Sequence, residues 1–128
     1  MKLKDHHVLI VEDEIFVAME LEDVVRAAGG NVVGPAMTAP EAFTLIENHA
    51  VTAAILDVRL GVYDTSGIAR RLEAAKIPFI FYTGNTADMI SSSDWPSAPV
   101  VQKPASARDL LAALASAINT LQFDANRI

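Results

Sequence analysis

Four short apolar stretches of the chain end in residues that could do chemistry. Residues 8–11 run into Glu12 and Asp13, residues 52–56 into Asp57, residues 80–82 into Thr83 and Gly84, and residues 99–102 into Lys103. A carboxylate can attack phosphorus to give an acyl phosphate, and such a transfer needs mainly positioning and neutralisation of charge on the phosphoryl oxygens. Carboxylates, a hydroxyl and an amine could supply both the positioning and the neutralisation of charge. If the fold gathers the four stretch ends, the sequence predicts an aspartate that accepts a phosphoryl group.

The elements that must position these residues follow a regular alternation. Short apolar stretches separated by helix-length segments are typical of buried parallel strands. We expect strands near residues 6–11, 31–36, 52–57, 77–82 and 99–102, with helices at 14–28, from 38 onwards, at 65–75 and at 106–121. The carboxyl ends of such strands share one edge of the sheet, where α/β proteins bind ligands. This pattern predicts one (βα)5 domain over residues 1–128.

Composition narrows the class of protein. The 128 residues are 52% hydrophobic and 20% charged, which is typical of a globular chain. The net charge is -6 and no Lys/Arg-rich run is present, so we expect no binding to nucleic acid. The absence of cysteine excludes a disulfide framework and a thiolate metal site. The apolar run near the N-terminus is too short for a signal peptide or a membrane span, and we expect a cytoplasmic protein without membrane contact.

The motifs, taken together, resemble those of a receiver domain of a two-component response regulator. The matching residues are Glu12-Asp13, Asp57, Thr83-Gly84 and Lys103-Pro104, each at an expected strand end and in the same order. The resemblance covers the whole length of the chain. It implies a doubly wound, flavodoxin-like three-layer sandwich with a five-stranded parallel sheet in the order 2-1-3-4-5. It also implies a phosphoprotein that catalyses only its own phosphoryl transfer and dephosphorylation.

A magnesium ion suits this chemistry, because Mg²⁺ is usually held by one or two carboxylates together with waters and a phosphate oxygen. We expect Asp13 and Asp57 to be direct ligands and Glu12 to be an outer ligand through water. The resemblance implies that the backbone carbonyl of Arg59 is a further ligand.

The phosphoryl group itself is expected to sit on Asp57 and to contact three other residues. Lys103 would pair with it as a point charge. Thr83 would donate a hydrogen bond to a phosphoryl oxygen, and Gly84 would leave space and offer its amide.

Two departures from the usual receiver pattern bear on output. Typical members carry an aromatic residue three positions before the strand-five lysine, where this chain has Val100. The stretch Phe81-Tyr82-Thr83-Gly84 resembles an atypical class of stand-alone receivers that read Phe-Ala-Thr-Gly at this place. We therefore expect signalling to proceed by ordering of residues 85–98, a segment of low intrinsic helix stability.

The expected phosphoryl donor is a histidine kinase or a histidine phosphotransfer protein, and the first helix is expected to help dock it. The predicted buried stripe of that helix is Val17, Leu21, Val24 and Ala28. Ile15 and Met19 then share the opposite face, with Phe16 adjacent. Output is expected by contact with an unknown downstream protein, with the chain a monomer or weak dimer.

Other interpretations remain open at this point. Taken singly, an acid at a helix start can serve the helix dipole, a threonine can cap a helix, and a lysine can lie along the surface. An aspartate-nucleophile phosphatase would need a second acid two residues after Asp57, where Arg59 stands. A phosphorylation-independent module of the same fold would be expected to have lost part of the acid pair, the acceptor or the lysine.

Overall fold

Five apolar segments form a single parallel sheet in the computed structural model, which describes residues 3–61, 63–84, 95 and 98–125. The sheet strands are β1 (His7–Val11), β2 (Asn31–Ala36), β3 (Ala53–Leu56), β6 (Phe79–Thr83) and β7 (Val100–Gln102). Their spatial order is β2-β1-β3-β6-β7. Read as the five main strands, this is the predicted order 2-1-3-4-5, and the doubly wound fold is confirmed.

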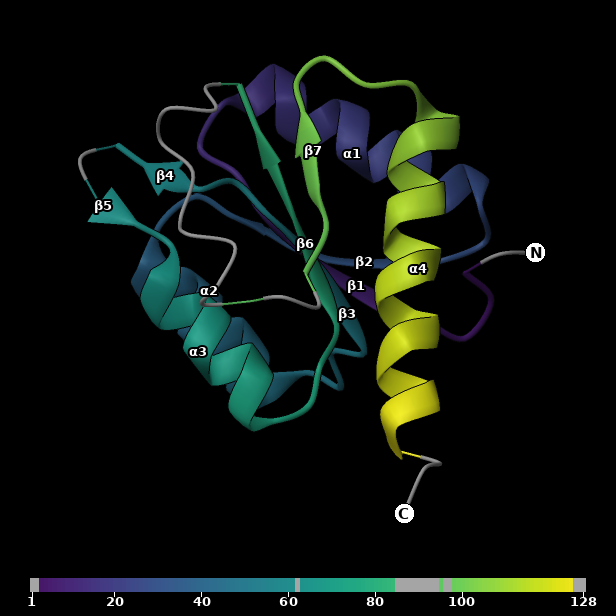
Figure 1. Ribbon diagram of the computed structural model, residues 1–128. Coiled ribbons are helices and arrows are strands. Elements are labelled where there is room, and N and C mark those ends of the chain that lie inside the picture. Colours follow the sequence, from purple (N-terminus) through teal and green to yellow (C-terminus); the bar gives the residue numbers. More distant parts are fainter. Residues whose placement is uncertain (1–2, 62, 85–94, 96–97, 126–128) are drawn as a thin grey trace.

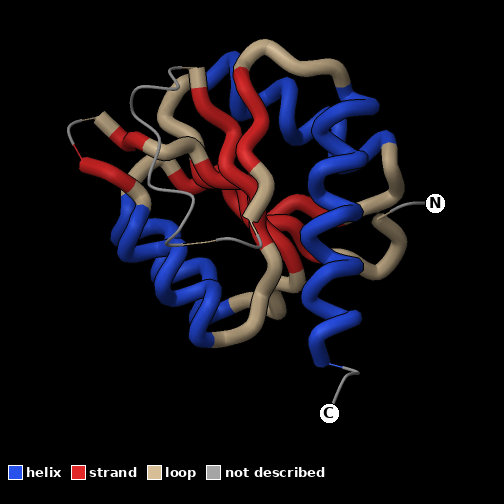
Figure 2. The backbone as a smooth tube through the Cα atoms, viewed as in Figure 1, coloured by secondary structure: helices blue, strands red, loops and turns tan. Residues whose placement is uncertain are grey.

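Helices cover both faces of the sheet (Figure 1). They are α1 (Ile15–Ala27), α2 (Ala39–Asn48), α3 (Ser66–Ala74) and α4 (Ala107–Ala125). Side chains alternate between faces along a strand, so each strand feeds two cores. Leu9 and Phe81 join the core under α2 and α3, whereas Ile10 and Tyr82 join the core under α1 and α4. The result is the three-layer sandwich seen along the backbone in Figure 2.

The buried face of α1 differs from the predicted stripe. The structure buries Ala18, Leu21, Val25 and Ala28, whereas Val17 and Val24 are only partly buried. Apolar residues lie on both flanks of Leu21, so the spacing locates this face only to within about one residue. Both stripes leave Ile15 and Met19 on the solvent side.

The connection after β3 also differs from the loop that was predicted there. It contains a small antiparallel hairpin made of β4 (Arg59–Leu60) and β5 (Tyr63–Asp64). Gly61 supports the turn with a φ of 64°, a left-handed conformation that glycine adopts without strain. The hairpin extends from the sheet edge that carries the candidate site (Figure 1).

The predicted switch segment, residues 85–98, lies outside the described residues except for Trp95 and Ala98. Trp95 is buried and packs edge-on against Phe81, with ring centroids 5.9 Å apart. This residue therefore belongs to the core under α3. Within the described ranges, no helix has both the length and the apolar character needed to cross a membrane.

Candidate functional site

The strand register brings the predicted chemical residues to one edge of the sheet. Val11 pairs with Leu56, and the amide of Asp57 donates a hydrogen bond of 2.9 Å to the Val11 carbonyl, which sets Asp57 beside the acids that follow β1. On the other side, the Lys103 amide donates to the Thr83 carbonyl at 2.8 Å. The resulting open pocket has a volume of about 250 Å³. Its lining residues are Asp13, Glu14, Asp57, Arg59, Gly61, Thr83, Gly84 and Lys103.

Three acids form the centre of this edge. Glu12, Asp13 and Asp57 each offer a carboxylate oxygen, and these oxygens lie within 4.8 Å of one another. Hard oxygen donors at this spacing fit a magnesium ion. Glu12 is buried, whereas Asp13 and Asp57 are half-buried and open to the pocket. The two acids expected as direct ligands, Asp13 and Asp57, therefore border the pocket, and Glu12, expected to act through water, lies behind them.

Lys103 places its ammonium among the acids. Its Nζ lies 2.8 Å from Glu12 Oε1, 3.2 Å from Asp57 Oδ2 and 3.5 Å from Glu14 Oε2. The contact with Glu12 Oε1 is close but lies outside good hydrogen-bond geometry. Burial alone would lower the pKa of Lys103, yet the carboxylates of Glu12 and Asp57 outweigh it and raise that pKa. The lysine therefore stays charged at any physiological pH.

Glu12 is the most perturbed acid of the site. Burial raises the pKa of Glu12 to about 7, and the neighbouring charge of Asp57 adds to the rise, although Lys103 and a hydrogen bond from the Glu14 amide oppose it. Near neutral pH this carboxyl is divided between its two protonation states. Its charge thus depends on what else occupies the pocket.

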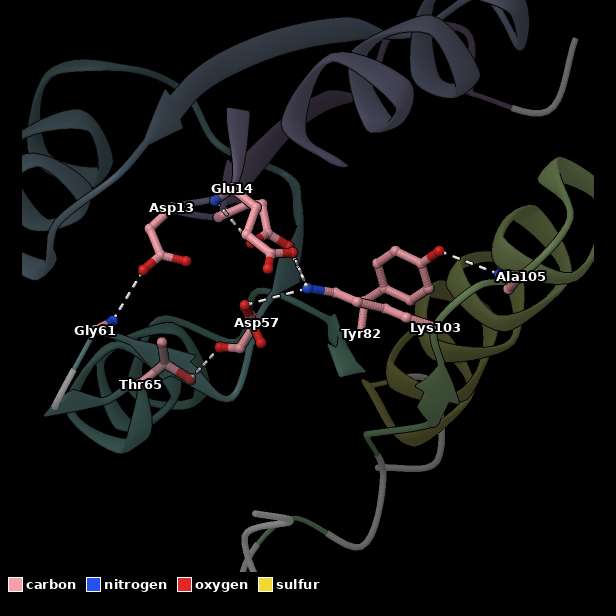
Figure 3. A network of polar contacts seen from close by, with 9 residues as sticks. Asp13, Glu14, Asp57, Gly61, Thr65, Tyr82, Lys103 and Ala105 are labelled. Carbon is pink, nitrogen blue, oxygen red and sulfur yellow. Dashed lines mark hydrogen bonds and ion pairs between the residues drawn. The ribbon is translucent and has the colours of Figure 1, made fainter. Parts of the chain in front are cut away.

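The loop after β3 is tied to the acids at both ends. The Gly61 amide at the hairpin turn donates to Asp13 Oδ2 at 2.9 Å. The buried Thr65 hydroxyl donates to the Asp57 carbonyl at 2.6 Å. Asp64 accepts from the Ser66 amide and hydroxyl, which lowers the pKa of Asp64 and closes the first turn of α3. The bonds of Gly61 and Thr65, drawn in Figure 3, fix the backbone on which Asp57 stands.

Thr83 and Gly84 take the places predicted for them at the end of β6. The Thr83 side chain is buried at the pocket wall. A Cβ built on Gly84 would lie 3.7 Å from Lys103 Cδ, so the glycine lies against the stem of the lysine. Arg59 is exposed and lines the pocket from β4.

Sequence reasoning missed four participants. The sequence marks Glu14 and Thr65 only as the starts of expected helices and Tyr82 only as part of a strand motif, and it assigns Gly61 no contact. Local patterns carry no signal for the contacts of Thr65, Gly61 or Tyr82, because each contact joins the residue to another element: Thr65 to the end of β3, Gly61 to the end of β1 and Tyr82 to the start of α4. Glu14 was visible as a third consecutive acid, and it approaches Lys103 from the solvent side.

The residues predicted to dock a partner are strongly exposed. Ile15 is 50% exposed, Phe16 81% and Met19 52%, which makes them the three most exposed large hydrophobic residues of the described chain. They occupy the first turns of α1, directly after the acids of the site. In the isolated chain these three apolar side chains face water, and a partner protein that covered them would bury them.

Comparison with known proteins agrees with this geometry. Residues 8–115 match the response regulator receiver domain family, a span that runs from Val8 in β1 to about the middle of α4 and contains all the acids at the pocket. The chain belongs to this family. The receiver is similar to the transcriptional regulatory protein PdtaR of Mycobacterium tuberculosis, with 30% identity over 115 residues that make up 88% of this chain and 56% of that protein. It thus spans about half the length of the curated relatives it matches.

Solved structures resemble the receiver over nearly its whole length. The solution structure of SdrG from Sphingomonas melonis Fr1 has a TM-score of 0.80 and 37% identity, and the match covers 92% of this chain and 98% of that one. A mutant of the anti-anti-sigma factor PhyR from Bartonella quintana has a TM-score of 0.77 and 27% identity, over 98% of this chain and 52% of that one. The receiver is therefore similar to a chain of its own size and to part of a larger regulator.

Proposed function

We propose that this receiver accepts a phosphoryl group on Asp57 from a histidine kinase or a histidine phosphotransfer protein. The observation that carries the proposal is the placement of the Lys103 ammonium 3.2 Å from the Asp57 carboxylate, inside a pocket walled by two further acids and by Thr83. A lone capping aspartate would not require a half-buried lysine. A phosphorylation-independent module would not require the acid pair, the acceptor aspartate and the lysine together.

Asp57 serves as the nucleophile in this proposal. One of its carboxylate oxygens forms a bond to phosphorus while the bond between phosphorus and the donor's imidazole nitrogen breaks, and the electron pair leaves with the imidazole. Lys103 neutralises charge on a phosphoryl oxygen, because its ammonium already faces Asp57. The Thr83 hydroxyl and the Gly84 amide stand at the same wall to bind another oxygen.

Asp13, Asp57 and the backbone carbonyl of Arg59 would hold magnesium, with Glu12 acting through water. Their oxygen donors and the opening of the pocket support this assignment. When bound, the ion supplies positive charge that offsets the repulsion between the acids and the incoming phosphoryl group.

The donor protein docks on the exposed apolar patch of Ile15, Phe16 and Met19. These side chains adjoin the acids at the start of α1, so a partner seated there can present its phosphohistidine to the pocket. Output then proceeds by contact with a downstream protein. The similarity to PhyR, an anti-anti-sigma factor, supports a protein target for this receiver as well.

The decisive test is chemical labelling. Asp57→Asn should abolish the mass gain of about 80 Da that one phosphoryl group adds when the protein is incubated with acetyl phosphate and magnesium. Asp64→Asn is the matched control, since Asp64 lies in the same connection but bonds to Ser66 at the start of α3 and faces solvent. This control should be labelled like the wild type. Label that persists in Asp57→Asn would overturn the assignment.

A further inference from the structure

Tyr82 stands between the reactive lysine and the start of the last helix. Its side chain is only 2% exposed and lies in the core under α1 and α4. A buried phenol hydroxyl needs a hydrogen-bond partner. The Tyr82 hydroxyl accepts one from the Ala105 amide at 3.1 Å, two residues beyond Lys103 and two before α4.

The ring of the same residue contacts the lysine. Lys103 Nζ lies 5.6 Å from the centroid of the Tyr82 ring, within the distance at which an ammonium is attracted to an aromatic face. Figure 3 shows the lysine stem running beside the ring, with the ammonium directed to Asp57 and the phenol oxygen directed the opposite way, to Ala105. One side chain therefore touches both the charged end of Lys103 and the backbone that follows it.

A lysine requires such guidance because its flexible stem has many rotamers to lose. The carboxylates of Glu12, Asp57 and Glu14 all attract the ammonium, so it has three competing partners. Gly84 borders the stem but offers no side chain to hold it. Tyr82 supplies an apolar wall beside the stem.

We propose that Tyr82 is a positioning residue for Lys103, whose ring directs the ammonium toward Asp57 and whose hydroxyl anchors the turn between Lys103 and α4. The inference rests on the proposed phosphoryl-acceptor function of the pocket. It adds a residue that touches neither the phosphoryl group nor the metal. It also connects the lysine to the turn that leads into α4, because the same side chain contacts Lys103 and bonds to Ala105.

The experiment separates the two parts of the side chain. Tyr82→Phe keeps the ring and removes the acceptor, so exchange of the Ala105 amide should accelerate about tenfold while labelling by acetyl phosphate stays within about twofold of wild type. Tyr82→Leu removes both parts. Labelling should then slow by about threefold to tenfold, and the order parameter of Lys103 Cε, measured by NMR in metal-free protein, should fall. Tyr82→Met is the second ring-free variant if Tyr82→Leu does not fold.

Magnesium affinity distinguishes positioning from general damage. Tyr82 bonds to Ala105 and faces Lys103, so the magnesium affinity of each variant should remain within about twofold of wild type. Phe81→Leu is the matched control, because Phe81 is a buried aromatic of the same strand that faces the other core, against Phe79 and Trp95. It should leave both labelling and the order parameter of Lys103 unchanged.

Two outcomes would overturn the inference. One is a ring-free variant with wild-type labelling and an unchanged Lys103 order parameter. The other is a loss of magnesium affinity in proportion to the loss of labelling, which would assign Tyr82 a purely structural role. If the wild type itself takes no phosphoryl group, the proposed function fails, and the order parameter and Ala105 exchange still decide the role of Tyr82.

Discussion

At the scale of single residues, the balance of charge around Lys103 determines how the site behaves. One ammonium faces three carboxylates, so at least one acid lacks a full counter-charge. Glu12 is the acid with the least access to water, and its pKa rises accordingly to about 7. A change in pH near neutrality therefore acts first on this buried carboxyl.

Glu12 should make stability depend on pH in a defined direction. Its ordinary pKa is 4.5 and its folded pKa is about 7, so between these values the folded state binds more protons than the unfolded state. The free energy of unfolding that Glu12 contributes is then greatest below pH 4.5 and is lost as the pH rises toward 7, with a slope of at most about 1 kcal/mol per pH unit.

Glu12→Gln provides the measurement, because the amide cannot titrate. Urea unfolding of both proteins in EDTA, from pH 4.5 to 7.5, should show the wild type losing stability relative to Glu12→Gln as the pH rises through this window. A difference that stays constant across the range would contradict the raised pKa. Other acids titrate in both proteins and cancel in the comparison.

Thr65 gives a second prediction at this scale. Its buried hydroxyl donates to the Asp57 carbonyl at 2.6 Å. Thr65→Val keeps the shape and removes the donor, so urea unfolding should show a loss of about 1–2 kcal/mol. Thr44→Val, at an exposed position of α2, is the control and should change stability by less than about 0.5 kcal/mol. Equal effects of the two variants would mean that the hydroxyl of Thr65 contributes nothing specific.

A site residue could be predicted from sequence only where a local pattern marks its position. Asp57, Thr83 and Lys103 each follow an apolar strand, so the pattern that reveals the strand also locates the residue. The contacts of Thr65 and Tyr82 depend on backbone atoms of other segments, and no local pattern encodes them. Glu14 shows a third case: the acid is evident in the sequence, and only the structure shows that it reaches Lys103.

At the scale of elements, α1 and the β3–α3 connection show the limits of pattern reading. Periodicity predicted α1 correctly as a helix and misplaced its buried face by about one residue, because valines flank Leu21 on both sides. The β4–β5 hairpin has strands of two residues each, too short to produce an alternating pattern. Tertiary contacts such as the Gly61–Asp13 hydrogen bond hold it instead.

The exposed face of α1 should govern the choice of phosphoryl donor. Ile15→Ser with Met19→Ser should slow transfer from a cognate phosphotransfer protein by about tenfold or more, since buried interface hydrophobes dominate binding energy. Labelling by acetyl phosphate, which needs no docking, should be unchanged. Stopped-flow or gel-based transfer assays give the rates.

The control for this surface is Met37→Ser with Phe43→Ser. These residues are each 36% exposed and lie outside α1. Transfer from the same donor should remain at the wild-type rate. If both double variants slow transfer equally, or if the α1 variant also loses acetyl phosphate labelling, docking on α1 is wrong.

At the scale of the whole molecule, the parallel sheet divides the interior into two cores and gathers the site at one edge. The number and order of the main strands were predictable because each strand is short, apolar and separated by a helix-length segment. Residues 85–94 and 96–97 lie outside the described part of the chain. The switch predicted for that segment stays a prediction.

Magnesium should stabilise the entire fold, because its ligands come from segments that are joined only in the folded chain. At a concentration about 100 times the dissociation constant, binding to the folded state should add about 2.7 kcal/mol to the free energy of unfolding. Thermal unfolding in magnesium and in EDTA measures this. Asp13→Asn should reduce the shift, whereas Asp109→Asn, an exposed acid on α4, should retain it. The same shift in both variants would argue against Asp13 as a ligand.

The hydrogen bond from the Gly61 amide to Asp13 should change when an ion binds at the acidic site. Only Oδ2 of Asp13 accepts from this amide, and the bond joins residues 48 positions apart. A cation on the other oxygen would withdraw electron density from the carboxylate and weaken the acceptor. The Gly61 amide proton should therefore move upfield as the site fills. One resonance at the tip of the hairpin would report ion binding without any label or added probe.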